Sequence, residues 1–133
     1  MTATVTYSGA LRTYATHLKS GNSIITDAPT DNHGKGENFS PTDLVATALA
    51  SCALTVMGIK ANQKGIDIDG AKSEITKIMA SNPRRIAEVQ IKIMMPKGTY
   101  TEDEKKLLEH TARTCPVAQS VHPDLVQQLS FVW

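Results

Sequence analysis

The chain has 133 residues, with 14 Lys and Arg against 13 Asp and Glu, which leaves a formal net charge of +1. This balance argues against a protein that binds nucleic acid electrostatically, and 5% aromatic residues are too few for a platform on which bases stack. Hydrophobic residues make up 41% of the chain and charged residues 20%, which favours a folded domain over a disordered chain. The length predicts one domain, or one half of an intertwined dimer.

Three features of the sequence bear on its compartment. The 2 cysteines are too few for a disulfide-dense secreted scaffold. Residues 1–11 have neither the basic nor the apolar region of a signal peptide, so we expect a cytoplasmic protein with reduced thiols. Residues 44–59 carry no charge, but this run is shorter than the ~20 residues of a spanning helix and contains hydroxyl side chains. It predicts a buried helix of a soluble protein rather than a membrane segment.

The first part of the chain, residues 1–39, is expected to form short strands and then a loop. The strands, which are rich in residues that favour extended structure, are expected at 4–7, 11–18 and 23–26. Turn signals separate them at Ser8-Gly9 and Gly21-Asn22. Residues 27–39 are rich in Pro, Gly and Asx and predict a loop, which at this length in a small domain is often functional.

A long central helix is expected over residues 40–64. Ser40 suits the N-cap, Pro41 the first helical position, and Asp43 the position where an acid completes a capping box. Gly65 is expected to end the helix. The many Ala residues within it make the helix slim, so that neighbouring backbones can approach it closely.

The remainder predicts a pair of strands in residues 65–100, then helices and a closing strand in residues 101–133. The strands are expected at 71–80 and 86–94, and the closing strand at 129–133. Thr101 begins a second capping box, so a helix is expected to follow it to about Thr114. A short helix beginning at Pro116 would place Cys115 near its N-cap. Together, the elements predict a single α+β domain over residues 1–133.

The two cysteines, Cys52 and Cys115, are the first candidates for chemistry. Free cysteine is often a small buried hydrophobe, so one interpretation is that the two are unrelated core residues. The other interpretation pairs them, because a thiol at a helix N-terminus is favoured as thiolate by the helix dipole and the unpaired amides. Cys52, inside an apolar helix, would then need a cation or donor from elsewhere. Arg12 is our candidate for it, although its position alone favours a solvated arginine at a hairpin.

Other kinds of site find little support in the sequence. The four histidines, at positions 17, 33, 110 and 122, stand at no zinc spacing from a cysteine or from each other, so we expect no metal site. Residues 34–37 lack the frame of a phosphate-binding loop, and no nucleophile elbow is present.

Two motifs resemble the signatures of the OsmC/Ohr family. Residues 40–52, SPTDLVATALASC, resemble the family's Pro-containing cap, acid, Leu and small-residue helix that lead to a reactive cysteine. Cys115-Pro116-Val117 followed by Ser120 resembles the second signature. The resemblance extends over nearly the whole chain in length and element order, and it implies an α+β OsmC-like fold. It also implies an intertwined homodimer in which two central buried helices are wrapped by antiparallel sheets.

The resemblance further implies a thiol-dependent peroxidase that reduces organic hydroperoxides. Cys52 would be the peroxidatic thiol, which becomes a sulfenic acid, and Cys115 the resolving thiol, which condenses with it to a disulfide. An external dithiol, in the family often of the lipoyl type, would reduce the disulfide. The resemblance implies no cofactor and no metal, and we expect neither a nucleic acid nor a membrane as partner.

The family's peroxidases also place an arginine of the N-terminal hairpin near the peroxidatic thiol, and Arg12 stands in the matching position. In the organic-hydroperoxide branch a Glu directly follows the cap Pro and pairs with this arginine, whereas Thr42 stands here. Asp43 is one position further on and Glu37 lies on the preceding loop, so each is a candidate partner of Arg12. The alternative function is an OsmC-like dimeric binding or redox-stress protein with a reactive thiol pocket and little peroxidase turnover.

Overall fold

The computed structural model describes residues 1–133 and confirms the α+β class. In chain order the elements are β1 (Ala3–Gly9), β2 (Arg12–His17), β3 (Ser23–Asp27), the 3-10 helix η1 (Thr30–Asn32), α1 (Pro41–Lys64), β4 (Lys72–Ala80), β5 (Arg85–Met94), α2 (Glu102–Arg113), α3 (Pro116–Ser120) and β6 (Val126–Val132). The chain divides into two compact units, Met1–Val45 and Ala46–Trp133, which are described in turn.

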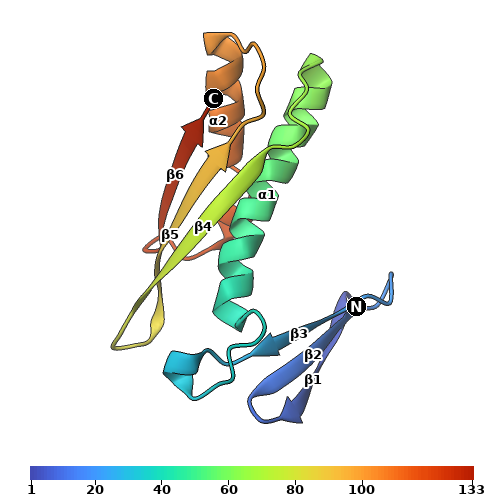
Figure 1. Cartoon of the computed structure of the whole chain (residues 1–133), viewed down its shortest axis with the longest axis vertical. Helices are drawn as coiled ribbons and strands as arrows, with labels where there is room; N and C mark the ends of the chain where they lie inside the picture. The colour runs from blue at the N-terminus through green and yellow to red at the C-terminus, as the bar shows by residue number, and fades with distance from the viewer. The chain divides into compact units, whose positions relative to one another are not determined.

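The first unit is a three-stranded antiparallel sheet in the order β1-β2-β3, followed by the loop that contains η1 (Figure 1). The turn between β1 and β2 falls on Ala10 and Leu11, whose φ angles of 54° and 59° fit a tight hairpin. It therefore lies just beyond the expected Ser8-Gly9. The loop after β3 folds back on itself, since a Cβ at Gly34 would lie 1.7 Å from the Ala28 carbonyl oxygen.

Apolar burial contributes little to the first unit. Its buried side chains are polar, namely those of Thr26, Asp27 and Ser40. Large apolar side chains of its strands are exposed, for example Val5, Tyr7 and Ile24. A sheet of three strands gains independent stability from an apolar face packed against something. Within the single chain, hydrogen bonds therefore hold this unit together more than apolar contacts do.

Helix α1 begins and ends at the residues that the sequence predicts. The Ser40 Oγ accepts a hydrogen bond of 3.0 Å from the Asp43 backbone N–H, and the Asp43 carboxylate accepts one of 2.9 Å from the Ser40 backbone N–H. This reciprocal pair is a capping box with Pro41 at the first helical position. At the other end Gly65 has a positive φ of 67°, and Ile66 donates its backbone N–H to a carbonyl of the last turn. Such a glycine ends a helix because a residue with a Cβ is strained there.

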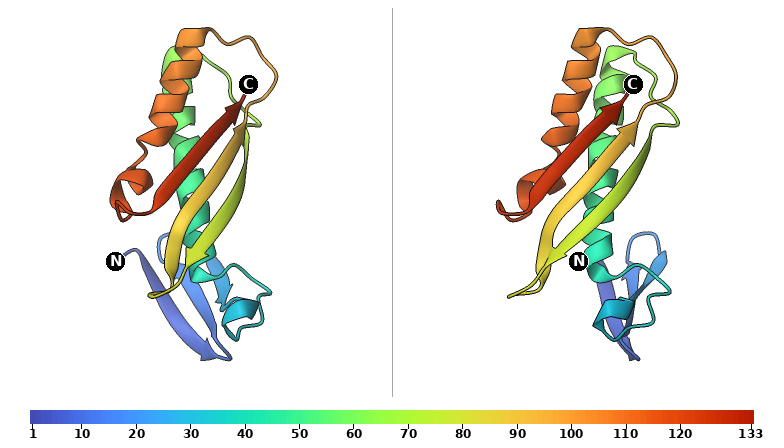
Figure 2. Two further views of the ribbon diagram at one scale, coloured as in Figure 1. Left: turned by 90° about the vertical axis from the view of Figure 1, so that its left-hand side faces the viewer. Right: turned by 60° about the vertical axis from the view of Figure 1, so that its left-hand side comes forward.

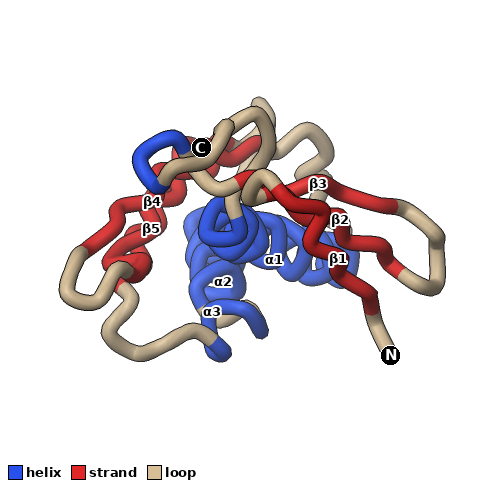
Figure 3. Tube along the Cα trace, turned by 90° about the horizontal axis from the view of Figure 1, so that it is seen from below, coloured by secondary structure: helices blue, strands red, loops and turns tan.

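The second unit contains a sheet in the order β4-β5-β6 with α1 and α2 on one of its faces (Figure 2). β4 and β5 form an antiparallel hairpin, whereas β6 joins β5 in parallel, so this sheet is mixed rather than wholly antiparallel. The closing strand begins at Val126, three residues before the expected position 129. The parallel pairing is possible because α2 and α3 carry the chain back along the sheet before β6 begins (Figure 2). Figure 3 shows α2 and α3 beside α1.

The core of the second unit lies between this sheet and the helices. From Val89 to Ile93 every second residue of β5 is buried. These side chains meet the small-residue face of α1 and Leu108 of α2. The buried core residues of these three elements are Ala46, Leu49, Ala50, Ala53, Met57, Ala61, Val89, Ile91, Ile93, Leu108 and Ala112. Four alanines and one methionine on the same helix face allow the strands to lie close to α1, as its composition predicts.

By length and composition α1 is long and apolar enough to cross a membrane, with a mean hydropathy of 1.7 over the relevant window. Helices in the core of soluble proteins meet the same criteria, and 33% of that window is buried inside the chain. One face of α1 lies in the core of the second unit, and the expectation that the helix lies outside a membrane stays a prediction.

The capping box yields a prediction about stability. Ser40→Ala removes the acceptor of the Asp43 backbone N–H, so we expect the free energy of unfolding to fall by about 1 kcal/mol. Urea unfolding followed by circular dichroism measures this change. Thr101→Ala, which removes the same bond at the start of α2, is the matched comparison and should cost a similar amount. An unchanged midpoint and slope for Ser40→Ala would contradict the assignment of Ser40 as the cap.

Candidate functional site

The two thiols lie in the second unit, on elements that the sequence placed correctly. Cys52 is near the middle of α1 and is partly buried, whereas Cys115 is the N-cap of α3 and is only 1% exposed. Both cysteines are free thiols, and both belong to the same core cluster. The Cys115 Sγ accepts a hydrogen bond of 3.4 Å from the Ala118 backbone N–H, as a side chain at the N-cap is expected to do.

The two thiols lie in one core, because Cys52 packs against the buried cluster that includes Cys115. Burial raises the pKa of the Cys115 thiol, and hydrogen bonding with the Cys52 side chain raises it further. The backbone N–H groups of Ala118 and Val117 oppose this and lower it. The structure therefore brings Cys52 and Cys115 together from positions far apart in the sequence, with Cys115 held as the protonated thiol at neutral pH. Two adjacent thiols are the reactants that a disulfide requires.

A second polar cluster lies in the first unit, around Arg12. Arg12 begins β2 and faces Asp27, the last residue of β3, across the antiparallel pair. The Arg12 Nε donates to Asp27 Oδ1 at 2.7 Å and its Nη2 donates to Asp27 Oδ2 at 2.9 Å, which is the bidentate geometry typical of arginine and carboxylate. Asn38 adds a third hydrogen bond, from its Nδ2 to Asp27 Oδ2 at 3.0 Å.

This ion pair is strongly favoured in its charged form. The hydrogen bonds from Arg12 and from Asn38 hold the pKa of Asp27 well below its usual range, although burial works in the opposite direction. The hydrogen bond with Asp27 likewise raises the pKa of Arg12 above its usual range. Glu37 Oε2 lies 3.9 Å from the Arg12 Nη2, but its side chain is 64% exposed, so solvent screens the attraction.

The two acids that the sequence offers as partners of Arg12, Glu37 and Asp43, make different contacts. Glu37 is near Arg12, whereas the carboxylate of Asp43 accepts the Ser40 backbone N–H and caps α1. The main partner is Asp27, which the sequence analysis assigned to the start of the loop and overlooked. A signal for it was present, because a hairpin around Gly21 in the register observed here sets residue 12 opposite residue 27.

The candidate residues thus fall into two groups in two different units. Cys52 and Cys115 form a thiol pair in the second unit, and Arg12, Asp27, Glu37 and Asn38 form a charged cluster in the first. No group of three or more His, Cys, Asp or Glu side chains is arranged to hold a metal ion.

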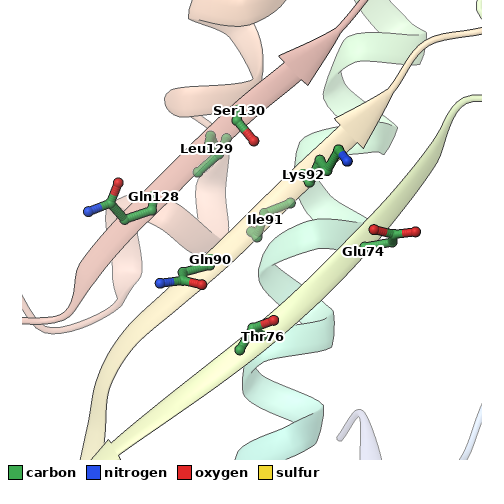
Figure 4. A pocket seen from close by; sticks show the side chains of 8 residues that line it. All are labelled: Glu74, Thr76, Gln90, Ile91, Lys92, Gln128, Leu129 and Ser130. Atoms are coloured by element: carbon green, nitrogen blue, oxygen red, sulfur yellow. The ribbon is translucent and has the colours of Figure 1, made fainter.

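Two hollows on the surface of the second unit involve neither thiol. The larger one, of about 440 Å³, lies on the sheet and is lined mainly by polar side chains of β4, β5 and β6 (Figure 4). Its lining residues are Glu74, Thr76, Gln90, Ile91, Lys92, Gln128, Leu129 and Ser130. The other, of about 380 Å³, lies around residues 65–69 and 96–104. Neither hollow is lined by a cysteine.

Comparison with protein families and with solved structures gives consistent matches. The family model described as OsmC-like protein matches residues 34–129. A protein from Psychrobacter arcticus 273-4, provisionally named an osmotic stress induced and detoxification response protein, is 55% identical. The match covers 99% of this chain and 96% of that protein, with a TM-score of 0.96. No curated protein matches the sequence.

More distant solved structures share the fold. An organic hydroperoxide resistance protein OsmC from Legionella pneumophila, also described as a predicted redox protein, is 16% identical with a TM-score of 0.78, over 100% of this chain and 98% of that one. An organic hydroperoxide resistance protein from Elizabethkingia anophelis is 15% identical with a TM-score of 0.76, over 98% of this chain and 95% of that one.

The lowered pKa of Asp27 predicts how stability depends on pH. A carboxyl group whose pKa is depressed by folding contributes stability that is fully present above its unfolded pKa of about 4 and is lost as pH falls toward the folded pKa. Asp27→Asn should therefore be less stable than the native chain at pH 7, by a margin that is constant down to about pH 5 and shrinks below pH 4. Thermal unfolding from pH 7 to pH 2.5 tests this, and a margin that grows in acid would contradict it.

Proposed function

The chain belongs to the OsmC-like family, and on that basis we propose that it is a two-cysteine peroxidase that reduces organic hydroperoxides. The observation that carries this proposal is the pairing of Cys52 with Cys115, two free thiols that interact within one core. Support also comes from the relatives named for organic hydroperoxide resistance and for detoxification. A role in the response to redox stress, in the cytoplasm, is the corresponding cellular proposal.

The reaction begins at Cys52, the less buried of the two thiols. Its thiolate attacks the terminal oxygen of the hydroperoxide, the O–O bond breaks, and the alkoxide takes up a proton and leaves as the alcohol. Cys52 is then a sulfenic acid. The Cys115 thiol condenses with it, which forms the disulfide and releases water. An external dithiol reduces the disulfide by exchange and is itself oxidised to a disulfide, which restores both thiols.

In this proposal Arg12 stabilises the Cys52 thiolate and donates hydrogen bonds to the peroxide. A guanidinium is suited to both tasks, because it keeps its charge at all physiological pH values and offers five donors in a rigid plane. Asp27 occupies two of these donors, which leaves others for a peroxide oxygen or a thiolate. Asp43 caps α1, and this proposal gives it no further role.

We further propose that the chain acts as a homodimer. One side of α1 leaves an uncharged stripe exposed within the chain, at Ala48, Ser51, Thr55 and Ile59, and Ile59 is 54% exposed. The first unit has exposed apolar strands and buries no apolar side chain. A second copy that covers both surfaces would supply the apolar burial that a small chain lacks.

The peroxidase proposal predicts disulfide formation on exposure to peroxide. Reduced protein mixed with cumene hydroperoxide should lose two hydrogen atoms per chain, with Cys52 joined to Cys115, and should do so faster than with hydrogen peroxide. Stopped-flow measurements followed by mass spectrometry of the digested protein provide the readout. Slow and unselective oxidation would contradict the proposal and favour the alternative, a redox-stress protein with a thiol pocket that binds its ligand without turnover.

Variants of the two cysteines separate their roles. Cys52→Ser should abolish peroxide consumption. Cys115→Ser should reduce one equivalent of peroxide and then stop, with Cys52 trapped as a sulfenic acid. If Cys115→Ser turned over normally with a dithiol, Cys115 would not be the resolving thiol.

The dimer proposal predicts a molar mass in solution of twice the 14.4 kDa of the chain. Ile59→Glu introduces a charge into the exposed stripe of α1 and should shift the mass toward that of one chain. Gln63→Glu places the same side chain beyond the uncharged run and should leave the mass unchanged. Light scattering coupled to size-exclusion chromatography measures all three proteins. A native mass of 14.4 kDa would overturn the proposal.

A further inference from the structure

We propose that Asp27 is the positioning residue for Arg12, and that Asn38 holds Asp27 in place for this role. This inference rests on the function proposed above, in which Arg12 acts on the thiolate and the peroxide. It assigns a role to two residues that neither the motifs nor the sequence analysis singled out.

The backbone brings the two side chains together without long-range packing. Arg12 and Asp27 are partners in the register of the β2–β3 pair, so their Cβ atoms stand on the same face of the sheet. The Ala28 backbone N–H donates to the Leu11 carbonyl at 3.0 Å, which continues the pairing by one further residue on each strand. Backbone pairing between the two strands on both sides of Arg12 and Asp27 therefore fixes the distance between their backbones.

The contact between them determines the orientation of the guanidinium. Two parallel hydrogen bonds, from Nε and Nη2 to the two carboxylate oxygens, fix the plane of the guanidinium as well as its position. A single hydrogen bond would leave the plane free to rotate. Glu37 cannot replace this contact, because its oxygen is 3.9 Å from Nη2 and its side chain is largely exposed.

Asp27 is itself held by the end of the loop. Its side chain is 1% exposed and accepts a third hydrogen bond from Asn38. Its backbone N–H donates to the Phe39 carbonyl at 3.1 Å, which closes the loop at its base. With three donors on its two oxygens, Asp27 is engaged as an acceptor and has no role in transferring a proton. Its function is to hold Arg12.

Asp27 leaves one edge of the Arg12 guanidinium available to donate hydrogen bonds to a substrate. Nε and the inner N–H of Nη2 face Asp27, so Nη1 and the outer N–H of Nη2 remain along the far edge. This edge can donate two hydrogen bonds to the oxygens of a peroxide, or to one oxygen and a thiolate. Asp27 is therefore the carboxylate that holds this guanidinium by two hydrogen bonds.

The test is a double-mutant cycle in the Cys115→Ser background, where Cys52 is the only thiol. The variants are Asp27→Asn, Arg12→Ala and the two combined, with Glu37→Gln as the comparison at the exposed acid. Asp124→Asn, at a carboxylate that is 91% exposed, is the surface control. The readouts are the rate of Cys52 alkylation by iodoacetamide between pH 5 and pH 10, and the rate constant for cumene hydroperoxide. Circular dichroism and thermal unfolding confirm that each variant is folded.

We expect Asp27→Asn to lower the rate constant for peroxide by roughly tenfold to a hundredfold and to shift the alkylation profile to higher pH, because Arg12 is displaced from its productive orientation. In the Arg12→Ala background the same substitution should change neither readout. Glu37→Gln should change the rate constant by less than about threefold, as is usual for exposed pairs. Asp124→Asn should match the native profile.

The outcomes distinguish this inference from the proposal on which it rests. If Arg12→Ala leaves both readouts unchanged, the role of Arg12 fails and the positioning role of Asp27 fails with it. If Arg12→Ala slows the reaction but folded Asp27→Asn does not, only the positioning role is overturned. An equal loss on adding Asp27→Asn to Arg12→Ala also overturns it, because Asp27 would then act independently of Arg12.

A second variant covers the case in which Asp27→Asn does not fold. Asn38→Ala removes one hydrogen bond from Asp27 at an exposed residue and keeps the ion pair. We expect a smaller decrease in the rate constant for peroxide, of roughly threefold, that again disappears in the Arg12→Ala background. An undiminished rate constant in folded Asn38→Ala together with a normal pH profile would remove Asn38 from the proposal, and a loss that persists without Arg12 would overturn the inference.

Discussion

The close approach of other backbones to α1 is the constraint on which the thiol pair depends. A cysteine side chain is short, so two thiols interact only where their backbones come close to each other. The buried face of α1 carries alanines at 46, 50, 53 and 61, and larger side chains there would hold the rest of the core away. The N-cap geometry of Cys115 then directs its sulfur into the core rather than into solvent. The small side chains of α1 thus allow Cys115 to lie close to Cys52.

The two units are stabilised in different ways. The second has an apolar core between a mixed sheet and two helices, whereas the first buries only polar side chains and relies on hydrogen bonds and on the Arg12–Asp27 ion pair. Hydrogen bonds depend on geometry more sharply than apolar contacts do. In the proposed function, a unit built on hydrogen bonds would suit the orientation of a guanidinium, and an apolar unit would suit the burial of sulfur away from water.

Local signals predicted much of the fold and the identity of the thiols. Ser40 and Gly65 mark the ends of α1 because capping and positive φ are properties of single residues and their immediate neighbours. The start of β6 was missed because Gln127 and Gln128 lack the character of strand formers, and pairing with β5 decides their conformation. Asp27 was missed because its partner is set by hairpin register, a relation between two segments that residue types alone do not reveal.

The position of Cys115 at the N-cap of α3 also determines how a disulfide at this site would be reopened. In the proposed cycle an incoming thiolate would attack the more accessible sulfur, which is that of Cys52, so the leaving group would be Cys115. As the S–S bond breaks, negative charge develops on a sulfur that already accepts a hydrogen bond from the Ala118 backbone N–H. In the proposed cycle the mixed disulfide would consequently form on α1, and burial, which raises the pKa of the Cys115 thiol, would favour prompt protonation of the departing sulfur.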